Sequence, residues 1–169
     1  MKEDAEIKTS LKSEDFIPTE IKVIKYIQKI PGLKHIMSLI SIPFNMPFYP
    51  IIAIVLFYYR LLNKDYLIII LVSQFVIWYI KNLFRRQRPY AVYKDIKKLE
   101  PLPLDVYSFP SGHTFNAFIM SFLLEKHSGY SLGIIPYMVG FSRVYLGVHF
   151  PTDVIGGYIF AKLLVLLIE

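Results

Sequence analysis

Residues 66–80, with the sequence YLIIILVSQFVIWYI, decide the class of this protein, because only Ser73 and Gln74 interrupt an otherwise apolar stretch. A helix needs about 20 mainly apolar residues to cross a hydrocarbon layer, and we expect this helix to continue to about Phe84. The whole chain of 169 residues shares the bias, with 54% hydrophobic residues, 19% charged residues and a mean hydropathy of +0.44. Average soluble domains have about 45–50% apolar and about 25% charged residues. The sequence therefore favours lipid, rather than water, as the main solvent.

Four more stretches have the composition of membrane-spanning helices. Their apolar cores are short, at about 11–16 residues, but flanking aromatic and polar residues bring most of them near the length of a span. A chain of 169 residues cannot surround five such helices with polar layers, which argues against a soluble protein. The sequence predicts one all-α domain, a polytopic transmembrane helix bundle over residues 43–169, with five spans and room for a sixth. Besides residues 66–80, the predicted spans are residues 48–62, 114–124, 132–147 and 154–168.

Two N-terminal segments are predicted to lie outside this bundle. Residues 1–20 mix charges and lack the apolar core of a signal peptide, which favours a mobile tail. In residues 21–42, isoleucines recur at helical spacing with lysines on the opposite side, as in a helix that lies at a membrane surface. The alternative is an amphipathic helix packed on a protein core. The isoleucines are Ile21, Ile24, Ile27 and Ile30.

Glycines recur every seven residues at Gly133, Gly140 and Gly147, and the pair Gly156 and Gly157 opens the last predicted span. Small residues on one stripe let membrane helices approach closely. We expect these glycines to mark a contact between helices.

Composition also limits the function. The chain has no cysteine, which excludes a disulfide scaffold, a cysteine nucleophile and a thiolate zinc site. Its net charge of +6 fits nucleic acid, anionic lipid headgroups or a phosphorylated substrate. The apolar stretches argue against nucleic acid as the partner. A transporter is also disfavoured, because the predicted spans lack charged groups along their middle. A phosphate or lipid ligand is favoured.

The first motif follows the span at residues 66–80 and reads KNLFRRQRP over residues 81–89. Lys81 and Arg88 lie seven residues apart, so both point the same way if the helix continues, and Arg85 then joins their stripe. Clustered cations repel unless an anion lies between them, and an ammonium with a guanidinium suits a phosphoryl group. Alone, the motif also fits a basic collar that binds lipid headgroups.

The second motif is Pro110-Ser111-Gly112-His113-Thr114, immediately before an apolar helix. Ser111 is placed as an N-cap, and the backbone N–H groups beside it form an anion site together with the helix dipole. His113 would then lie beside the anion, where it could donate a proton. Alone, the motif also fits an ordinary capped helix with a surface histidine.

The third motif covers residues 142–153 and contains Arg143, His149 and Asp153. A carboxylate beside an imidazole fixes its tautomer and leaves the other nitrogen free to attack. Alone, the motif also fits a salt bridge between Arg143 and Asp153. If the spans are counted from residue 48, all three motifs lie at helix ends on one membrane face.

Together the motifs resemble the signature of the type 2 phosphatidic acid phosphatase superfamily: Lys-x6-Arg-Pro, Pro-Ser-Gly-His and Ser-Arg-x5-His-x3-Asp. The chain carries all three parts in order. The resemblance implies phosphoryl transfer in two steps, without a metal or cofactor. It implies that His149 is the nucleophile, that Asp153 orients it and that His113 protonates the leaving group. It implies that the phosphate oxygens are held by Lys81, Arg88, Ser111, Gly112 and Arg143.

The expected function is an integral membrane phosphatase that removes the terminal phosphate of a lipid phosphate or diphosphate, through a phosphohistidine. Candidate substrates are phosphatidylglycerophosphate, undecaprenyl diphosphate, phosphatidic acid and the 1-phosphate of lipid A, and the basic loop at residues 94–98 could recognise a polyanionic headgroup. The alternatives are a vanadium haloperoxidase, which the hydropathy disfavours, and a non-catalytic protein that binds lipid phosphates. We expect the chain in the inner membrane, with its site on the extracytoplasmic face.

Overall fold

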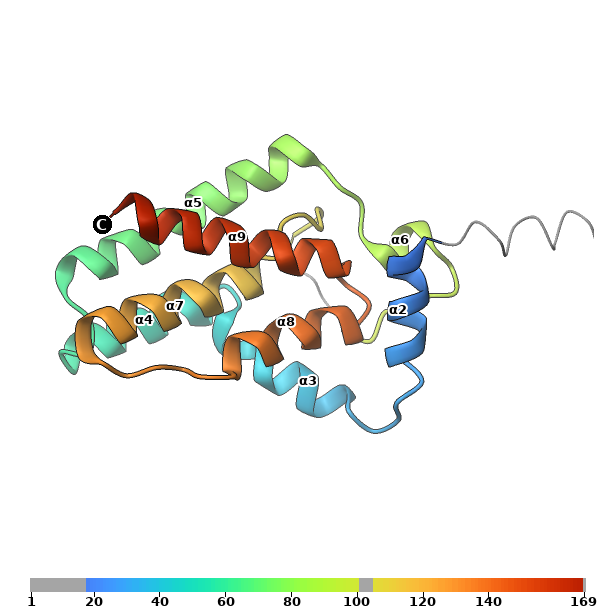
Figure 1. Cartoon of the computed structure of the whole chain (residues 1–169), viewed down its shortest axis with the longest axis horizontal. Helices are drawn as coiled ribbons and strands as arrows, with labels where there is room; N and C mark the ends of the chain where they lie inside the picture. Colours follow the sequence, from blue (N-terminus) through green and yellow to red (C-terminus); the bar gives the residue numbers. More distant parts are fainter. Residues whose placement is uncertain (1–17, 101–104, 169) are drawn as a thin grey trace, which may run out of the picture.

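The computed structural model describes residues 18–100 and 105–168, and these form helices, turns and loops without a strand. The tail expected at residues 1–20 therefore lies almost entirely outside the described residues. The long helices run side by side along the molecule, and α2 lies across one end of them (Figure 1). The all-α class is confirmed. The helices are α2 (Thr19–Ile27), α3 (Lys34–Ser41), the 3-10 helix η1 (Ile42–Phe44), α4 (Phe48–Tyr58), α5 (Lys64–Phe84), α6 (Pro89–Val92), α7 (Gly112–Ser128), α8 (Ile135–Tyr145) and α9 (Pro151–Leu167).

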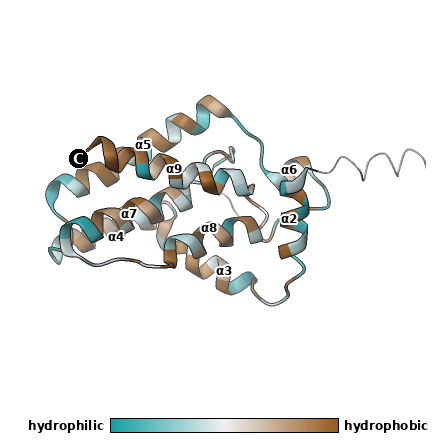
Figure 2. Ribbon diagram, in the orientation of Figure 1, coloured by the Kyte–Doolittle hydropathy of each residue, from teal (hydrophilic) through white to brown (hydrophobic). Residues whose placement is uncertain are grey.

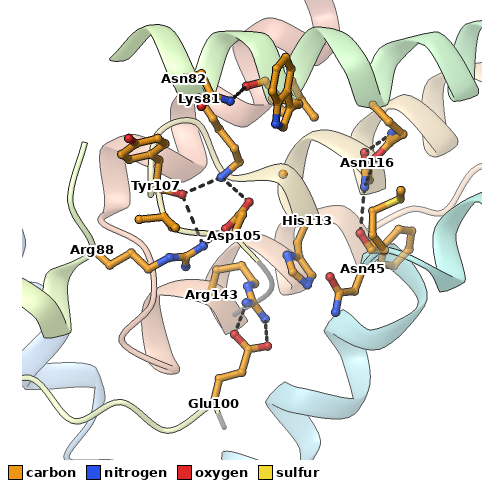
Figure 3. Close-up of a pocket in the computed structure, with 17 residues that line it drawn as sticks. Asn45, Lys81, Asn82, Arg88, Glu100, Asp105, Tyr107, His113, Asn116 and Arg143 are labelled. Carbon is orange, nitrogen blue, oxygen red and sulfur yellow. Dashed lines mark hydrogen bonds and ion pairs between the residues drawn. The ribbon is translucent and has the colours of Figure 1, made fainter. Parts of the chain in front are cut away.

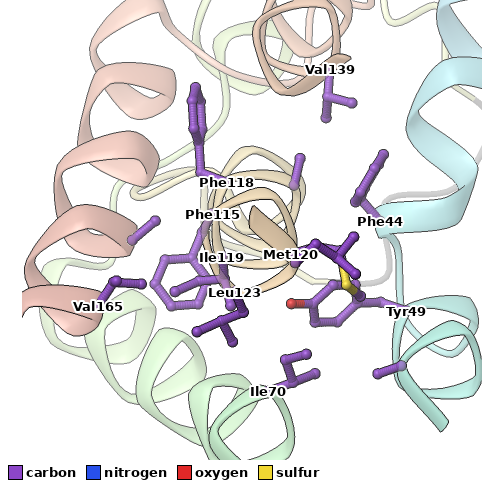
Figure 4. Close-up of a cluster of buried hydrophobic side chains, with 14 of the residues drawn as sticks. Phe44, Tyr49, Ile70, Phe115, Phe118, Ile119, Met120, Leu123, Val139 and Val165 are labelled. Atoms are coloured by element: carbon purple, nitrogen blue, oxygen red, sulfur yellow. The ribbon is translucent and has the colours of Figure 1, made fainter. Parts of the chain in front are cut away.

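Helix α7 is the centre of the bundle. Every residue from 114 to 121 is buried, so the helix is covered on all sides. Figure 4 shows Phe115, Ile119 and Leu123 of α7 surrounded by side chains of the other long helices. Because α7 is covered all round, its first turn is fixed relative to the ends of its neighbours. The neighbouring side chains in this core include Phe44, Tyr49, Ile70, Val139 and Val165.

The outer faces of the bundle are apolar. Phe75 and Trp78 of α5 are 66% and 55% exposed, and Ile159 and Leu163 of α9 are 46% and 49% exposed. Hydrophobic residues predominate along these long helices in Figure 2. Contiguous apolar surface of this kind marks contact with a membrane or another protein.

By length and composition, one helical stretch among the described residues, Lys64–Val92, could cross a membrane. A second candidate is the bent pair Lys34–Phe44 and Phe48–Tyr58, whose two parts meet at 59°. The other predicted spans form shorter helices. Helix α4 ends before Arg60, which has a φ of +59°, and α8 begins at Ile135 rather than at 132. The number of spans stays a prediction.

The expected membrane contact of the first isoleucines is wrong, and the alternative of a protein core holds for them. Ile21 and Ile24 of α2 are fully buried against Ile96, Val144 and Phe150. The segment beyond α2 turns at Pro31 and Gly32 and continues as the separate helix α3.

The prediction that the glycines mark contacts between helices is correct only in part. Helix α8 ends at Tyr145, and Gly147 lies in the following turn with a φ of +74°, so it is not on a helix face. Gly133 has open space around it. Gly140, Gly147, Gly156 and Gly157 do mark close contacts, because a Cβ at each would come within 2.7 Å of a neighbouring atom. For Gly147 that atom is the carbonyl oxygen of Lys97, in a loop rather than a helix.

Gly157 gives a direct test of the contact between α7 and α9. A Cβ at this position would lie 2.7 Å from the carbonyl oxygen of Ser111 and 3.2 Å from the amide nitrogen of Phe115, and backbone atoms cannot move aside easily. We expect Gly157→Ala to lower the free energy of unfolding by about 1–3 kcal/mol, as overpacking does. Thermal unfolding in detergent measures this, with Ile159→Ala on the exposed side of α9 as the control. Unchanged unfolding of Gly157→Ala would contradict the contact.

Candidate active site

Three helix ends line one cavity: the end of α5, the start of α7 and the end of α8. His149 and Asp153, at the start of α9, are buried and are not among the residues that line it. The cavity has a volume of about 420 Å³, and Lys81, Arg88, His113 and Arg143 line it (Figure 3). All three sequence motifs contribute to it, although they are far apart in the chain. The structure thus brings the motifs together as their placement at helix ends predicts.

Lys81 and Arg88 of the first motif are buried, and both donate to the carbonyl oxygen of Tyr107. Lys81 Nζ donates a hydrogen bond to the carbonyl oxygen of Tyr107 at 2.9 Å, and Arg88 Nη1 donates to that of Val148 at 2.9 Å. The expected helical stripe is nevertheless wrong, because α5 ends at Phe84 and Arg85 has a φ of +49°. Arg85 Nε donates to the carbonyl oxygen of Asn82 instead of facing the cavity. Arg88 reaches the site from extended backbone.

The second motif begins α7. Ser111 is the N-cap, its Oγ accepts hydrogen bonds from the amide and the hydroxyl of Thr114, and it is fully buried. A Cβ at Gly112 would lie 3.7 Å from Cε of Lys81, so the first turn of α7 lies directly beside this lysine. His113 lines the cavity. An anion held here would face the N-terminus of α7, where helix dipoles favour negative charge.

The third motif places the imidazole of His149 beside a buried carboxylate. His149 Nδ1 lies 3.4 Å from Asp153 Oδ2, and the two residues are 2% and 0% exposed. His149 Nδ1 makes no hydrogen bond within the described residues, and catalytic hydrogen bonds often shorten only when the substrate binds. Burial, and then the charges of Arg88, Lys81 and Arg143, hold the pKa of His149 well below its ordinary value of 6.5. A lowered pKa favours neutral His149 at neutral pH, which is the form that its predicted role as a nucleophile requires.

The alternative salt bridge between Arg143 and Asp153 does not form. Arg143 pairs with Glu100, and its Nη1 also donates to Ser41 Oγ at 3.0 Å. Buried Nε groups of Arg88 and Arg143 have no hydrogen-bond partner within the described part of the chain. Unpaired buried donors are costly, and the oxygens of a bound phosphate would satisfy them.

Two carboxylates that were not predicted from the sequence form ion pairs with the buried cations. Asp105 lies between Lys81 and Arg88, 3.0 Å from the lysine, and Glu100 pairs with Arg143 (Figure 3). Both residues are in the connection between α6 and α7, beyond the basic loop at residues 94–98. No regular spacing in that connection indicates where its carboxylates lie. They act as internal counter-ions at the place where phosphate is expected.

The opposite end of the cavity is uncharged. It follows α5 back toward the middle of the bundle, past Ile77 and Trp78 to Gln74, and Phe44 lines it as well. Gln74 Nε2 donates to Asn116 Oδ1 at 2.9 Å. The cavity therefore joins a cationic end to a mainly apolar end. Within the described residues, no group of three or more His, Cys, Asp or Glu side chains could hold a metal ion.

Comparison with known proteins places the chain in a family. The model of the PAP2 superfamily matches residues 63–168, which include every residue of the three motifs. The chain belongs to the PAP2 superfamily. The roles of its individual residues remain predictions from the motifs and from the geometry of the cavity.

Relatives in this superfamily include phosphatases with different lipid substrates. Phosphatidylglycerophosphatase B of Bacillus subtilis (strain 168) is 42% identical over 77 residues, which cover 37% of this chain and 38% of that protein. An undecaprenyl-diphosphatase of Sulfolobus acidocaldarius is 39% identical over 83 residues, which cover 47% of this chain and 40% of that protein. The matched regions thus span about two fifths of each relative.

A solved structure extends the comparison to nearly the whole chain. The transmembrane PAP2-type phosphatidylglycerolphosphate phosphatase of Bacillus subtilis has a TM-score of 0.66 and 27% identity. The alignment covers 92% of this chain and 87% of that one. The fold of this PAP2 protein is therefore that of a transmembrane phosphatase, and the comparison supports a membrane protein.

Asp105 allows the competition between carboxylate and phosphate to be tested. Asp105→Asn removes the charge that neutralises Lys81 and Arg88, so inorganic phosphate should bind about 5–10-fold more tightly, a gain of the size expected for a charged hydrogen bond. Isothermal titration calorimetry in detergent measures this affinity. Asp95→Asn is the control, because Asp95 is an exposed carboxylate that pairs only with Lys25 among the described residues. Unchanged or weaker binding of phosphate to Asp105→Asn would contradict the account of Asp105 as a competing anion.

Proposed function

We propose that this protein is an integral membrane phosphatase that hydrolyses the terminal phosphate of a lipid phosphate or lipid diphosphate. The observation that carries the proposal is the His149–Asp153 pair beside three buried cations, Lys81, Arg88 and Arg143. A phosphoryl group bound among these cations would neutralise them. The charges of the same three cations act on His149, which supports placing the phosphoryl group within reach of the histidine. Phosphoryl transfer depends mainly on such positioning and charge stabilisation.

In the first step, Nε2 of neutral His149 attacks phosphorus while Asp153 holds the proton on Nδ1. The bond between phosphorus and the oxygen of the lipid breaks as the bond between nitrogen and phosphorus forms. Burial and the nearby cations lower the pKa of His113, so His113 gains its proton as the negative charge of the phosphate enters, and it then gives that proton to the leaving oxygen. The charge on the phosphoryl oxygens is stabilised by Lys81, Arg88, Arg143, the Gly112 amide and Ser111. The Ser111 hydroxyl donates to one of those oxygens in addition to its capping role.

In the second step, water replaces the lipid. His113, now unprotonated, is placed to take a proton from this water, which attacks the phosphohistidine. The bond between nitrogen and phosphorus breaks, and inorganic phosphate leaves with His149 again neutral. No step requires a metal or a cofactor.

The uncharged end of the cavity supports a lipid substrate. Phe44, Ile77 and Trp78 would contact the part of the lipid next to its phosphate, and the apolar outer faces of α5 and α9 fit a bilayer. All four candidate lipids present a phosphate at the end of an apolar molecule. They are phosphatidylglycerophosphate, undecaprenyl diphosphate, phosphatidic acid and lipid A 1-phosphate. The named relatives act on two of these classes.

A panel of these four lipids in mixed micelles, with EDTA present, tests the proposed function. We expect phosphate release from at least one lipid, and His149→Ala should reduce kcat by at least about 100-fold because the nucleophile is lost. The matched control is His127→Ala, since His127 lies at the far end of α7. No release from any lipid by folded protein would favour the non-catalytic, phosphate-binding alternative. A His149→Ala protein that kept more than about a tenth of the activity would exclude His149 as the nucleophile.

The protonation of His149 can be measured without substrate. Because burial and the nearby cations lower its pKa, His149 should remain neutral at pH 6.5 and gain a proton only at lower pH. Nitrogen-15 NMR of histidine-labelled protein in detergent measures this, with His149→Gln to assign the resonance. A His149 that is already half protonated at pH 6.5 would contradict the charge environment described here.

We propose that the protein has five spans and that its cavity faces the extracytoplasmic side. The chain has no cysteine, so one cysteine introduced as Lys98→Cys in the loop after α6 reports the side without background. We expect a membrane-impermeant maleimide to label it in intact cells. Labelling only after the membrane is opened would place the loop in the cytoplasm.

A further inference from the structure

Asp153 has a charged partner, Arg86, in addition to the neutral imidazole of His149. Its Oδ1 pairs with Nη1 of Arg86 at 2.7 Å, while its Oδ2 accepts a hydrogen bond from the amide of Phe150 at 2.8 Å and faces His149. The two oxygens of the carboxylate thus have different partners. Because Asp153 is fully buried, its ionised form needs a paired charge, and Arg86 supplies it.

Arg86 is itself fixed on several sides. Its Nη1 donates to Thr152 Oγ1 at 2.6 Å, and its guanidinium stacks 4.0 Å from the ring centre of Phe150. Its carbonyl oxygen accepts a hydrogen bond from the amide of Ser108 at 2.8 Å. An arginine held in this way has little freedom, so it fixes the carboxylate that it contacts.

The other partner of Arg86 comes from the N-terminal helix. Glu20 of α2 accepts a hydrogen bond from Arg86 Nη2 at 2.9 Å, and its other oxygen accepts from the amide and the hydroxyl of Thr152. Burial raises the pKa of Glu20, but the hydrogen bonds from Thr152 and Arg86 outweigh it and hold that pKa below the ordinary value. Glu20 is therefore ionised at neutral pH. Its neighbour Ile21 anchors α2 on the protein.

Arg86 is distinct from the predicted phosphate-binding cations. It occupies a position between Lys81 and Arg88 that the motif leaves open, and it does not line the cavity. Its contacts lie on the side of Asp153 away from His149. It is placed to act on the nucleophile through Asp153 rather than on the phosphate.

We propose that Arg86 and Glu20 are positioning residues for the nucleophile, and that they act through Asp153. Arg86 keeps Asp153 ionised and holds Oδ1, which leaves Oδ2 facing Nδ1 of His149. Glu20 holds Arg86 and so connects the docked helix α2 to the active site. This inference rests on the proposed function, in which His149 attacks through Nε2 while its Nδ1–H is held by Asp153.

Arg86→Gln, compared with Arg85→Gln, tests the proposal. The two substitutions remove the same charge from adjacent residues, but the Arg85 side chain contacts only the Asn82 carbonyl among the interactions of the described residues. We expect Arg86→Gln to lower kcat by about 10–100-fold. KM should change less than about 2-fold, because the residues that bind the phosphate are unchanged. Arg85→Gln should keep kcat within about 2-fold of wild type, and Arg86→Lys should recover part of the loss because it restores the charge without the planar fork.

The tautomer of His149 gives a second readout that a purely structural role would not change. In the wild type, nitrogen-15 NMR should show Nδ1 protonated and Nε2 bare, and Arg86→Gln should populate the opposite tautomer. If Arg86→Gln does not fold, Glu20→Gln carries the test, with an expected loss in kcat of about 3-fold.

Three results would overturn the inference: a wild-type kcat in Arg86→Gln or Glu20→Gln, an equal loss in Arg85→Gln and Arg86→Gln, or a loss confined to KM. Each is measured against an active wild-type protein. An inactive wild type would instead count against the proposed function itself.

Discussion

The burial of three positive charges beside one another is the constraint on which the site depends. Lys81, Arg88 and Arg143 are 5%, 3% and 1% exposed, and such charges cannot remain buried together without anions. Asp105 and Glu100 supply those anions within the protein. Phosphate has the charge and the acceptor oxygens to replace them. The stability of the site and its affinity for phosphate are therefore coupled through the same cations.

The packing of the bundle holds these charges in place. Helix α7 is covered on all sides, and α9 contacts it closely at Gly157, where there is no room for a Cβ. The amide of Ser111 also donates to the carbonyl oxygen of Asp153 at 2.9 Å, which joins the start of α7 directly to the start of α9. The second and third motifs are thus fixed relative to each other by backbone contacts. Side-chain positions in the site follow from that frame.

The sequence predicts the class of the fold and part of the lining of the cavity, because apolar periodicity and helix ends are local properties. Ser111, His113 and Asp153 lie where their positions at the starts of helices indicate. Arg85 does not join the stripe of Lys81 and Arg88, because α5 ends at Phe84. Gly133 and Gly147 do not lie on a helix face, because α8 covers only Ile135–Tyr145. Glu20 and Arg86, like Asp105, could not be found from sequence, since their pairing depends on how α2 and the loop after α6 dock on the bundle.

The central claim is that His149 becomes covalently bound to phosphate, and rapid quenching with a lipid labelled at its terminal phosphate by phosphorus-32 tests it most directly. A bond between nitrogen and phosphorus is labile in acid and stable in base, so the account predicts protein-bound label with that behaviour in the wild type and none in His149→Ala. His113→Ala with a good leaving group would show whether the label accumulates when the second step is slowed. Turnover of the lipid without any protein-bound label, or label that persists in His149→Ala, would contradict the account.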